Sequence, residues 1–282
     1  MVSTADVLDR IHRSLARSNV AVRALLLLRN QVQCVLKYHL GGIANSDVNG
    51  EQLVVDTLAP YVQTFADVGA NVGNWSEMLV AKAPKSVKGL LFEPSDSAFA
   101  RLSANPLLTR SCELFQAAVS DSAGSRDFFE EPGAGETSSL MSSASRSTAV
   151  TRQISCVTLA DVLADRKWET LDFLKVDVEG FDLHVLRGAG DYLKAGRIGV
   201  IQFEYNNVWA HAGSTLFAAL QLLRQSGYDV FLIRADGISR FDYASYGEFF
   251  TYSNFLAVSP GWASRIDPLM GRALLQRRPR SP

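Results

Sequence analysis

The turn at residues 69–73 constrains the fold of this chain more than any other part of the sequence. An apolar strand, predicted over Thr64–Val68, runs directly into Gly69 and Gly73, and a helix is predicted from about Asn74 to Ala81. Glycines permit positive φ and let a ligand lie against the backbone, while a helix N-terminus offers free N–H groups. This pattern predicts a nucleotide-type ligand at the carboxyl end of the first strand.

Short apolar runs alternate with helical stretches as far as residue 258, which is typical of parallel βαβ units. With 282 residues, 47% of them hydrophobic, the chain is long enough for one sizeable α/β core. We therefore expect a Rossmann-like sheet of seven strands. The strands are predicted at Thr64–Val68, Gly89–Phe92, Glu113–Ala118, Phe173–Val176, Val200–Phe203, Val230–Arg234 and Asn254–Val258.

Residues 119–153 interrupt the alternation. A hairpin is predicted around Arg126–Glu130, followed by the stretch GAGETSSLMSSASRST. This stretch is interpreted either as a substrate loop or lid, or as a surface loop without function.

The two ends of the chain are basic. Apolar residues recur at helical spacing from Val7 to Leu36 with arginines between them, which predicts one or two amphipathic helices ending at Gly41-Gly42. These helices either cap the main domain or contact a membrane surface or a partner. We expect a helical extension over residues 1–50, a catalytic domain over 51–262 and a basic tail over 263–282.

Charge and cysteine usage exclude several classes of protein. The formal net charge of -1 argues against general nucleic-acid binding, which needs a clustered excess of Lys and Arg. Residues 1–40 hold six basic and two acidic side chains, and residues 265–282 hold five basic side chains and Asp267. Three cysteines in no paired spacing fit a reducing, cytosolic compartment. The apolar run at residues 24–28 is too short to span a bilayer, so we expect at most peripheral contact with the inner face of the membrane.

The glycine turn departs from the dinucleotide-binding fingerprint. It has the pattern G-x-x-x-G rather than G-x-G-x-x-G, and Asp67 precedes Gly69 by two positions. A carboxylate there disfavours the pyrophosphate of NAD but can face the cationic end of S-adenosyl-L-methionine. The predicted cofactor-binding residues of the turn are Gly69, Ala70, Asn71, Gly73, Asn74 and Trp75.

Glu93 ends the second strand, 24 residues after Gly69. An acidic side chain at this strand tip can accept hydrogen bonds from both ribose hydroxyls. Third-strand residues, with Ala118 and Val119 the best candidates, are then expected to lie against the adenine.

These motifs, in this order, resemble the FkbM family of methyltransferases. The resemblance runs from about Thr64 to Glu204, through FADVGANVG, LFEPS, AAVSD, TSSL, the V-T-L-x-D segment at residues 157–161, LDFLKVDVEGFD and IQFEYN. It implies transfer of a methyl group from S-adenosylmethionine to a hydroxyl of a sugar, glycolipid or polyketide acceptor. Residues 1–50 and 260–282 lie outside the resemblance.

The chemistry is expected where the central strand Phe173–Val176 ends, because that end faces the ligand at the switch point of the sheet. Asp177 and Glu179 follow this strand, and a carboxylate there can orient an attacking hydroxyl and accept its proton. The alternative is that Asp177 caps the following helix. Asp177 is also a candidate cofactor contact.

Glu204 ends the next strand and is followed by Trp209 and His211. Alternating polar and aromatic groups suit a sugar, and His211 is a further candidate base. The other histidines, His184 among them, show no clustering with carboxylates in the sequence. Asp177, Glu179 and Glu204 also supply oxygen ligands that would suit Mg2+, although their spacing does not establish a metal site.

Two other functions are compatible with such a fold. A nucleotide-dependent oxidoreductase or epimerase would use a similar sheet, but the G-x-x-x-G turn and the absence of a Tyr-x-x-x-Lys pair disfavour it. A non-catalytic S-adenosylmethionine-binding scaffold could use the basic ends as docking arms. Retention of Asp67, Glu93, Asp177 and Glu204 disfavours the scaffold.

Overall fold

The computed structural model of the chain describes residues 3–42, 45, 48–130 and 150–275. It divides into two compact units, Met1–Leu40 and Gly41–Pro282. The first unit contains α1 (Thr4–Ala16) and α2 (Asn19–His39), which confirms the helical reading of the N-terminal region. None of the helices built from the described residues combines the length and hydropathy needed to cross a bilayer.

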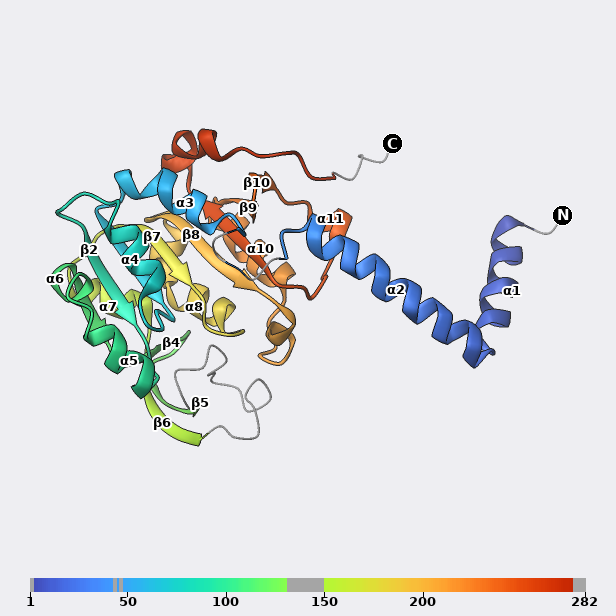
Figure 1. The fold of residues 1–282 in the computed structure, drawn as a ribbon, viewed down its shortest axis with the longest axis horizontal. Coiled ribbons are helices and arrows are strands. Elements are labelled where there is room, and N and C mark those ends of the chain that lie inside the picture. Colours follow the sequence, from blue (N-terminus) through green and yellow to red (C-terminus); the bar gives the residue numbers. More distant parts are fainter. Residues whose placement is uncertain (1–2, 43–44, 46–47, 131–149, 276–282) are drawn as a thin grey trace. The chain divides into compact units, whose positions relative to one another are not determined.

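The second unit is an α/β domain around a mostly parallel sheet, so the predicted fold class is confirmed (Figure 1). In the described residues this sheet has eight strands in the order β10-β9-β11-β8-β7-β1-β2-β3, one more than predicted. The additional strand is β10, a short edge strand antiparallel to β9. The strands are β1 (Thr64–Val68), β2 (Lys88–Phe92), β3 (Cys112–Phe115), β7 (Leu171–Val176), β8 (Ile198–Tyr205), β9 (Asp229–Arg234), β10 (Gly237–Arg240) and β11 (Ser253–Val258).

Helices cover both faces of this sheet, which is why its central strands are nearly continuous apolar runs (Figure 1). One layer consists of α3 (Glu51–Leu58), η1 (Ala59–Tyr61), α4 (Asn74–Val80), α5 (Asp96–Ser103), α6 (Leu108–Ser111) and η3 (Pro260–Leu269). The other consists of α7 (Leu159–Asp165), α8 (Asp182–Gly188), α9 (Gly190–Lys194) and α10 (Leu216–Gln225). The short helices η2 (Asn207–Ala210) and α11 (Tyr243–Tyr246) lie in loops after β8 and β10.

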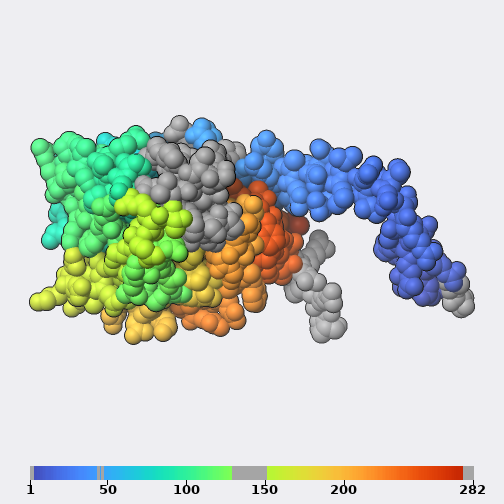
Figure 2. Space-filling view, turned by 90° about the horizontal axis from the view of Figure 1, so that it is seen from below, coloured from blue at the N-terminus to red at the C-terminus, as the bar shows by residue number. Residues whose placement is uncertain are grey.

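A second, three-stranded sheet interrupts the α/β pattern. It consists of β4 (Ala118–Val119), β6 (Val150–Val157) and β5 (Gly124–Glu130), with β6 in the middle. Figure 2 looks onto the face of the domain where the green β5 and yellow-green β6 reach the surface. The hairpin expected around Arg126–Glu130 is therefore one strand of a ladder with β6, which was not predicted. The Ser-rich stretch between the two strands lies outside the described residues.

The predicted third strand, Glu113–Ala118, is wrong at its carboxyl end. In the structure β3 stops at Phe115, and Ala118 belongs to β4 of the small sheet. The chain leaves the main sheet at Gln116, whose side chain bonds to the Asp96 carboxylate. Residues 114–119 are apolar except for Gln116, so the sequence pattern gave no clear sign of this change of sheet.

The glycine turn is fixed by its contacts with two neighbouring strands. Both Gly69 and Ala70 donate their N–H groups to the Phe92 carbonyl oxygen at 3.0 Å. Gly69 has a φ of 84°, and a Cβ built on it would lie 1.9 Å from the Asp177 carbonyl oxygen. The turn therefore lies directly against the chain that leaves β7, and only glycine leaves room for this approach.

We predict that Gly69→Ala destabilises the domain much more than Gly227→Ala. Gly227 has the same φ of 84°, but a Cβ added there would meet nothing within 4 Å. Gly227→Ala should therefore lower the free energy of unfolding only by the cost of holding alanine in the left-handed conformation, about 1–2 kcal/mol. Gly69→Ala adds to this cost a clash with the Asp177 backbone. Thermal unfolding of both variants measures the difference, and equal losses would show that the close approach to Asp177 does not matter.

Candidate functional site

Glu93 connects the end of β2 to the glycine turn. Its Oε2 accepts the Asn71 N–H at 2.8 Å, and its Oε1 accepts the Ser95 N–H at 2.7 Å. Asn71 itself has a positive φ of 49°, so the hydrogen bond holds a turn residue in a rarely populated conformation. A carboxylate has about four acceptor sites, so these two bonds are compatible with a ribose contact, which stays a prediction for Glu93.

The other turn residues differ in where they face. Ala70 is buried and Asn74 is exposed at the start of α4. Trp75 packs into the core, with its ring edge-to-face on Phe173 at 5.2 Å between centroids. Gly73 packs against Leu102 and Leu108 of the neighbouring helices. These environments give Gly73 and Trp75 a packing role, and the cofactor contacts predicted for the turn remain predictions.

Asp67 faces a cation supplied by the chain itself. Its side chain is fully buried, with Oδ2 accepting the Ser76 hydroxyl at 2.6 Å and Oδ1 lying 3.8 Å from Lys175 Nζ. Burial raises the pKa of Asp67, and the Lys175 charge and the Ser76 hydrogen bond limit that rise. The expected contact between Asp67 and a sulfonium stays a prediction.

Lys175 was not among the predicted site residues, yet it connects them. Its Nζ donates to Asp177 Oδ2 at 3.1 Å and lies 5.9 Å from the centre of the Trp75 ring. Burial alone would lower the pKa of Lys175, but Asp177, Asp67 and Glu51 outweigh it and raise that pKa. The lysine within the mostly apolar central strand β7 was a signal in the sequence, although its carboxylate partners could not be identified from it.

Glu51, at the start of α3, completes this buried polar cluster. Its Oε1 accepts the Nε2 amide of Gln202 from β8 at 2.8 Å, and burial raises its pKa. Among the described residues, Asp67 Oδ1, Asn71 Oδ1 and Gln202 Oε1 are buried without a hydrogen-bond partner. Asn71 lies in the glycine turn, so a ligand there would supply the donor that its Oδ1 lacks, because buried acceptors require donors.

The predicted carboxylates meet at the carboxyl ends of β7 and β8. Val176 pairs with Phe203 in the parallel ladder, so Asp177 and Glu204 occupy the next positions of adjacent strands. Glu179 follows with a φ of 50°, and Glu204 Oε1 accepts the Asn206 amide at 2.7 Å. Burial raises the pKa of Glu204 well above its ordinary value, and the neighbouring carboxylates raise it further.

Asp177 does not cap the following helix, so that alternative is wrong. Helix α8 begins at Asp182 with Phe181 as its N-cap and without a side-chain cap, while the Asp177 carboxylate binds Lys175. Asp182, the first residue of α8, is buried, and its Oδ2 accepts the Gly180 N–H at 3.3 Å.

The residues predicted to form the sugar-binding part of the site, Trp209 and His211, do not lie where they were expected. Trp209 is fully buried and packs edge-to-face on Tyr205 at 5.4 Å, so it belongs to the core. His211 is exposed after η2. Tyr252 is an aromatic residue on this side of the site, since its hydroxyl accepts the Asn254 amide at 3.2 Å and Asn254 pairs with Glu204 in the sheet. Burial and the charges of Glu204 and Glu51 raise the pKa of Tyr252. Tyr252 was not predicted, because it precedes β11, far from Glu204 in the sequence.

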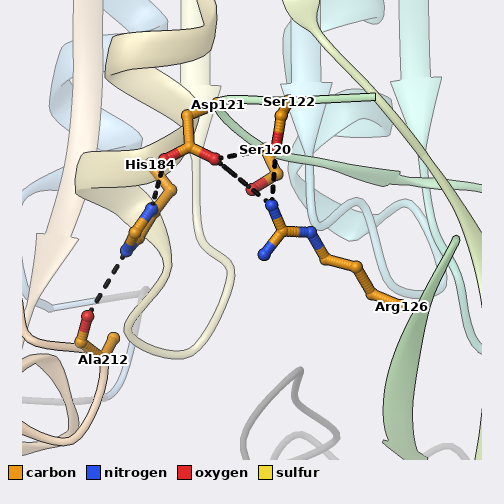
Figure 3. A network of polar contacts seen from close by, with 6 residues as sticks. All are labelled: Ser120, Asp121, Ser122, Arg126, His184 and Ala212. Carbon is orange, nitrogen blue, oxygen red and sulfur yellow. Dashed lines mark hydrogen bonds and ion pairs between the residues drawn. The ribbon is translucent and has the colours of Figure 1, made fainter. Parts of the chain in front are cut away.

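His184 has a carboxylate partner that the sequence did not reveal, which corrects the expectation for this histidine. Its Nδ1 lies 2.7 Å from Asp121 Oδ2, and its Nε2 lies 3.3 Å from the Ala212 carbonyl oxygen (Figure 3). Both partners are acceptors, so the ring makes both hydrogen bonds only as the imidazolium. Burial opposes ionisation of Asp121, but His184, Ser120 and Arg126 together lower its pKa. This network ties α8 to β4 and to the loop after η2.

The predicted adenine residues lie in a different sheet from the one expected. Ala118 and Val119 are buried in β4 of the small sheet rather than in the third strand of the main one.

No group of three or more His, Cys, Asp or Glu side chains in the described ranges is arranged to hold a metal ion. The geometry of Asp177, Glu179 and Glu204 therefore gives no support for Mg2+.

We predict that Asp182→Asn changes how stability depends on pH. Burial, with Asp177 and Glu179, raises the pKa of Asp182 well above 3.8. Stability is then greatest where Asp182 is protonated. It falls by about 1.4 kcal/mol for each pH unit between the pKa of the unfolded chain and the higher pKa of the folded protein. Melting temperatures from about pH 4 to about pH 9 should fall less with pH in the variant. A constant difference at every pH would contradict the prediction.

The chain matches the model of one protein family. The model of the methyltransferase FkbM domain matches residues 67–230, which include the glycine turn, Glu93, Asp177 and Glu204. No curated protein sequence matches the chain.

Solved structures resemble the fold at low identity. A putative O-methyltransferase from Klebsiella pneumoniae is 13% identical, with a TM-score of 0.41 over 79% of this chain and 86% of that chain. The O-methyltransferase TomG from Streptomyces achromogenes, solved with S-adenosylmethionine, is 13% identical, with a TM-score of 0.38 over 74% and 79%. The family match covers more than half of the chain, which therefore belongs to the FkbM family and is an S-adenosylmethionine-dependent methyltransferase.

Proposed function

We propose that this methyltransferase is an O-methyltransferase that methylates a hydroxyl group of a sugar, a glycolipid or a polyketide. The observation that carries the proposal is the adjacent placement of Asp177 and Glu204 at the carboxyl ends of two central parallel strands. Ligands of open α/β sheets bind at this edge. Carboxylates there can orient a hydroxyl and accept its proton.

The residues on the cofactor side fit S-adenosylmethionine. The turn that begins at Gly69 would lie beneath it, and Glu93 would receive its ribose hydroxyls. When bound, the cofactor supplies an electrophilic methyl group on a sulfonium. The buried acceptor Asn71 Oδ1 is available to its donor groups.

Glu204 is the better placed of the two carboxylates to accept a proton. Its raised pKa makes the ionised form more basic than an exposed carboxylate, which favours proton transfer from an alcohol. Asp177 is held by the Lys175 ammonium at 3.1 Å, which suits it to fix the direction of the hydroxyl. Both residues thus act on the same oxygen, with Asp177 orienting it and Glu204 removing its proton.

A hydroxyl-rich acceptor fits the surroundings of these carboxylates. Tyr252 is linked to Glu204 through Asn254, which bonds to the Tyr252 hydroxyl and pairs with Glu204, and aromatic rings pack against the C–H faces of sugars. Membership of a methyltransferase family removes the support for an oxidoreductase or an epimerase. A non-catalytic scaffold would bind the cofactor without turnover, so methyl transfer itself decides between it and an enzyme.

We expect Glu204→Gln and Asp177→Asn each to lower kcat by about 100- to 10,000-fold while leaving S-adenosylhomocysteine binding intact. Glu93→Gln is the matched control, because it should weaken cofactor binding with a smaller change in kcat. The assay uses methyl-labelled S-adenosylmethionine with sugar nucleotides, lipid-linked oligosaccharides and glycolipids, read by mass spectrometry. Wild-type kcat in both folded carboxylate variants would refute the proposed chemistry.

The pH profile provides a separate check. If ionised Glu204 is the base, kcat/KM should rise with pH. The midpoint of this rise should lie above 4.5, the ordinary pKa of a glutamate, and Glu204→Gln should abolish the rise. A metal-dependent reaction would instead lose activity on chelation and regain it with added Mg2+. Loss of activity on chelation would count against a mechanism that uses the carboxylates alone.

A further inference from the structure

The N-terminal unit has two helices but no core of its own. Within Thr4–His39, no side chain of α1 or α2 is buried. Leu28 is 61% exposed and Val35 is 70% exposed, although both are large and apolar. Such a concentration of exposed apolar side chains marks a surface that binds something.

Helix α1 separates apolar from charged residues. Val7, Leu8, Ile11 and Leu15 recur at helical spacing and fall on one face. The opposite face carries the basic residues Arg10, Arg13 and Arg17, together with Asp6 and Asp9. Arg13 bonds to Asp9 at 2.9 Å, so these charges lie along the polar face of the helix.

Helix α2 is divided less cleanly, because the exposed Leu26 and Leu27 lie on the side of its basic and amide residues, but its charge bias is stronger. Its apolar face consists of Leu25, Leu28, Val32, Val35 and Leu36, and its 21 residues include no Asp or Glu. Arg23 and Lys37 lie on the opposite face, and Arg29 lies at the boundary between the two. We call the apolar residues of both helices, named in this paragraph and the previous one, the N-terminal apolar face.

We propose that the N-terminal apolar face docks on an anionic lipid bilayer, with both helices lying in the plane of the membrane interface. Amphipathic helices with Lys and Arg on the polar face insert their apolar side between acyl chains, while the basic residues reach the headgroups. Charge complementarity selects this occupant, since residues 1–40 hold six basic and two acidic side chains. The inference does not depend on the identity of the methyl acceptor.

The same charges disfavour a second copy of the chain as the occupant. Two N-terminal units facing each other would bring like charges together, and α2 has no acidic side chain to form ion pairs with the basic residues of another copy. An anionic headgroup layer supplies the missing countercharge along the whole length of both helices.

The test is flotation of the full chain with vesicles of phosphatidylglycerol and phosphatidylcholine, compared with pure phosphatidylcholine. We expect binding to the anionic vesicles at about 0.05 M salt, and at least a tenfold loss of binding at about 0.5 M salt. The variant Ile11→Ser/Leu15→Ser/Leu28→Ser/Val32→Ser should lower binding at least about tenfold. The matched control Asn30→Ser/Gln33→Ser, on the polar face of α2, should bind as the wild type does.

A charge variant separates the two contributions. Arg13→Gln/Arg17→Gln/Arg23→Gln keeps the N-terminal apolar face and should bind anionic vesicles at least about tenfold more weakly at low salt. Retained S-adenosylhomocysteine binding in every variant shows that the methyltransferase domain is folded. Circular dichroism with phosphatidylglycerol vesicles reports whether the N-terminal helices form.

Three results would overturn the proposal. The first is absence of binding to phosphatidylglycerol vesicles at low salt. The second is equal binding to neutral and anionic vesicles, which would remove the role of the basic residues. The third is a stable dimer that the apolar-face variant converts to a monomer in sedimentation, without any vesicle binding by the wild type, which would identify a second copy as the occupant.

Discussion

The rest of the site depends on the interaction of the buried Lys175 ammonium, at the centre of the sheet, with the carboxylates around it. A buried ammonium is tolerated only when it is paired, and here carboxylates from β1, the end of β7 and the start of α3 surround it. Removing the lysine would leave Asp67 and Asp177 as neighbouring, poorly compensated negative charges. The same ion cluster therefore contributes to the packing of the central strands and fixes the direction of the Asp177 side chain.

The sequence predicted the parts of the fold that depend on local patterns. Apolar runs located the strands of the main sheet, and the spacing of glycines located the turn, because periodicity and backbone freedom are properties of neighbouring residues. The edge strand β10 was missed since it is short and ends in polar residues. The pairing of β5 with β6 joins segments separated by residues 131–149, and no local pattern specifies such a ladder.

The candidate site shows the same limit. Asp177 and Glu204 could be placed together from strand order alone, since parallel neighbours end at one edge. Lys175 was overlooked because a lysine in a strand ordinarily faces solvent, and only the three-dimensional arrangement shows the carboxylates around it. The pairing of His184 with Asp121, 63 residues apart, likewise depends on tertiary packing. Trp75 and Asp67 belong to the predicted motif, but their side chains turn inward.

The contact between Gly69 and the Asp177 carbonyl oxygen also limits how this enzyme can change over evolutionary time. Because the two backbones touch, a substitution that moves the backbone at Asp177 also displaces the glycine turn. The glycine turn and the segment that follows β7 therefore cannot diverge independently. Segments that avoid this contact, such as the small sheet of β4, β5 and β6 or the loop after η2, can change without that constraint.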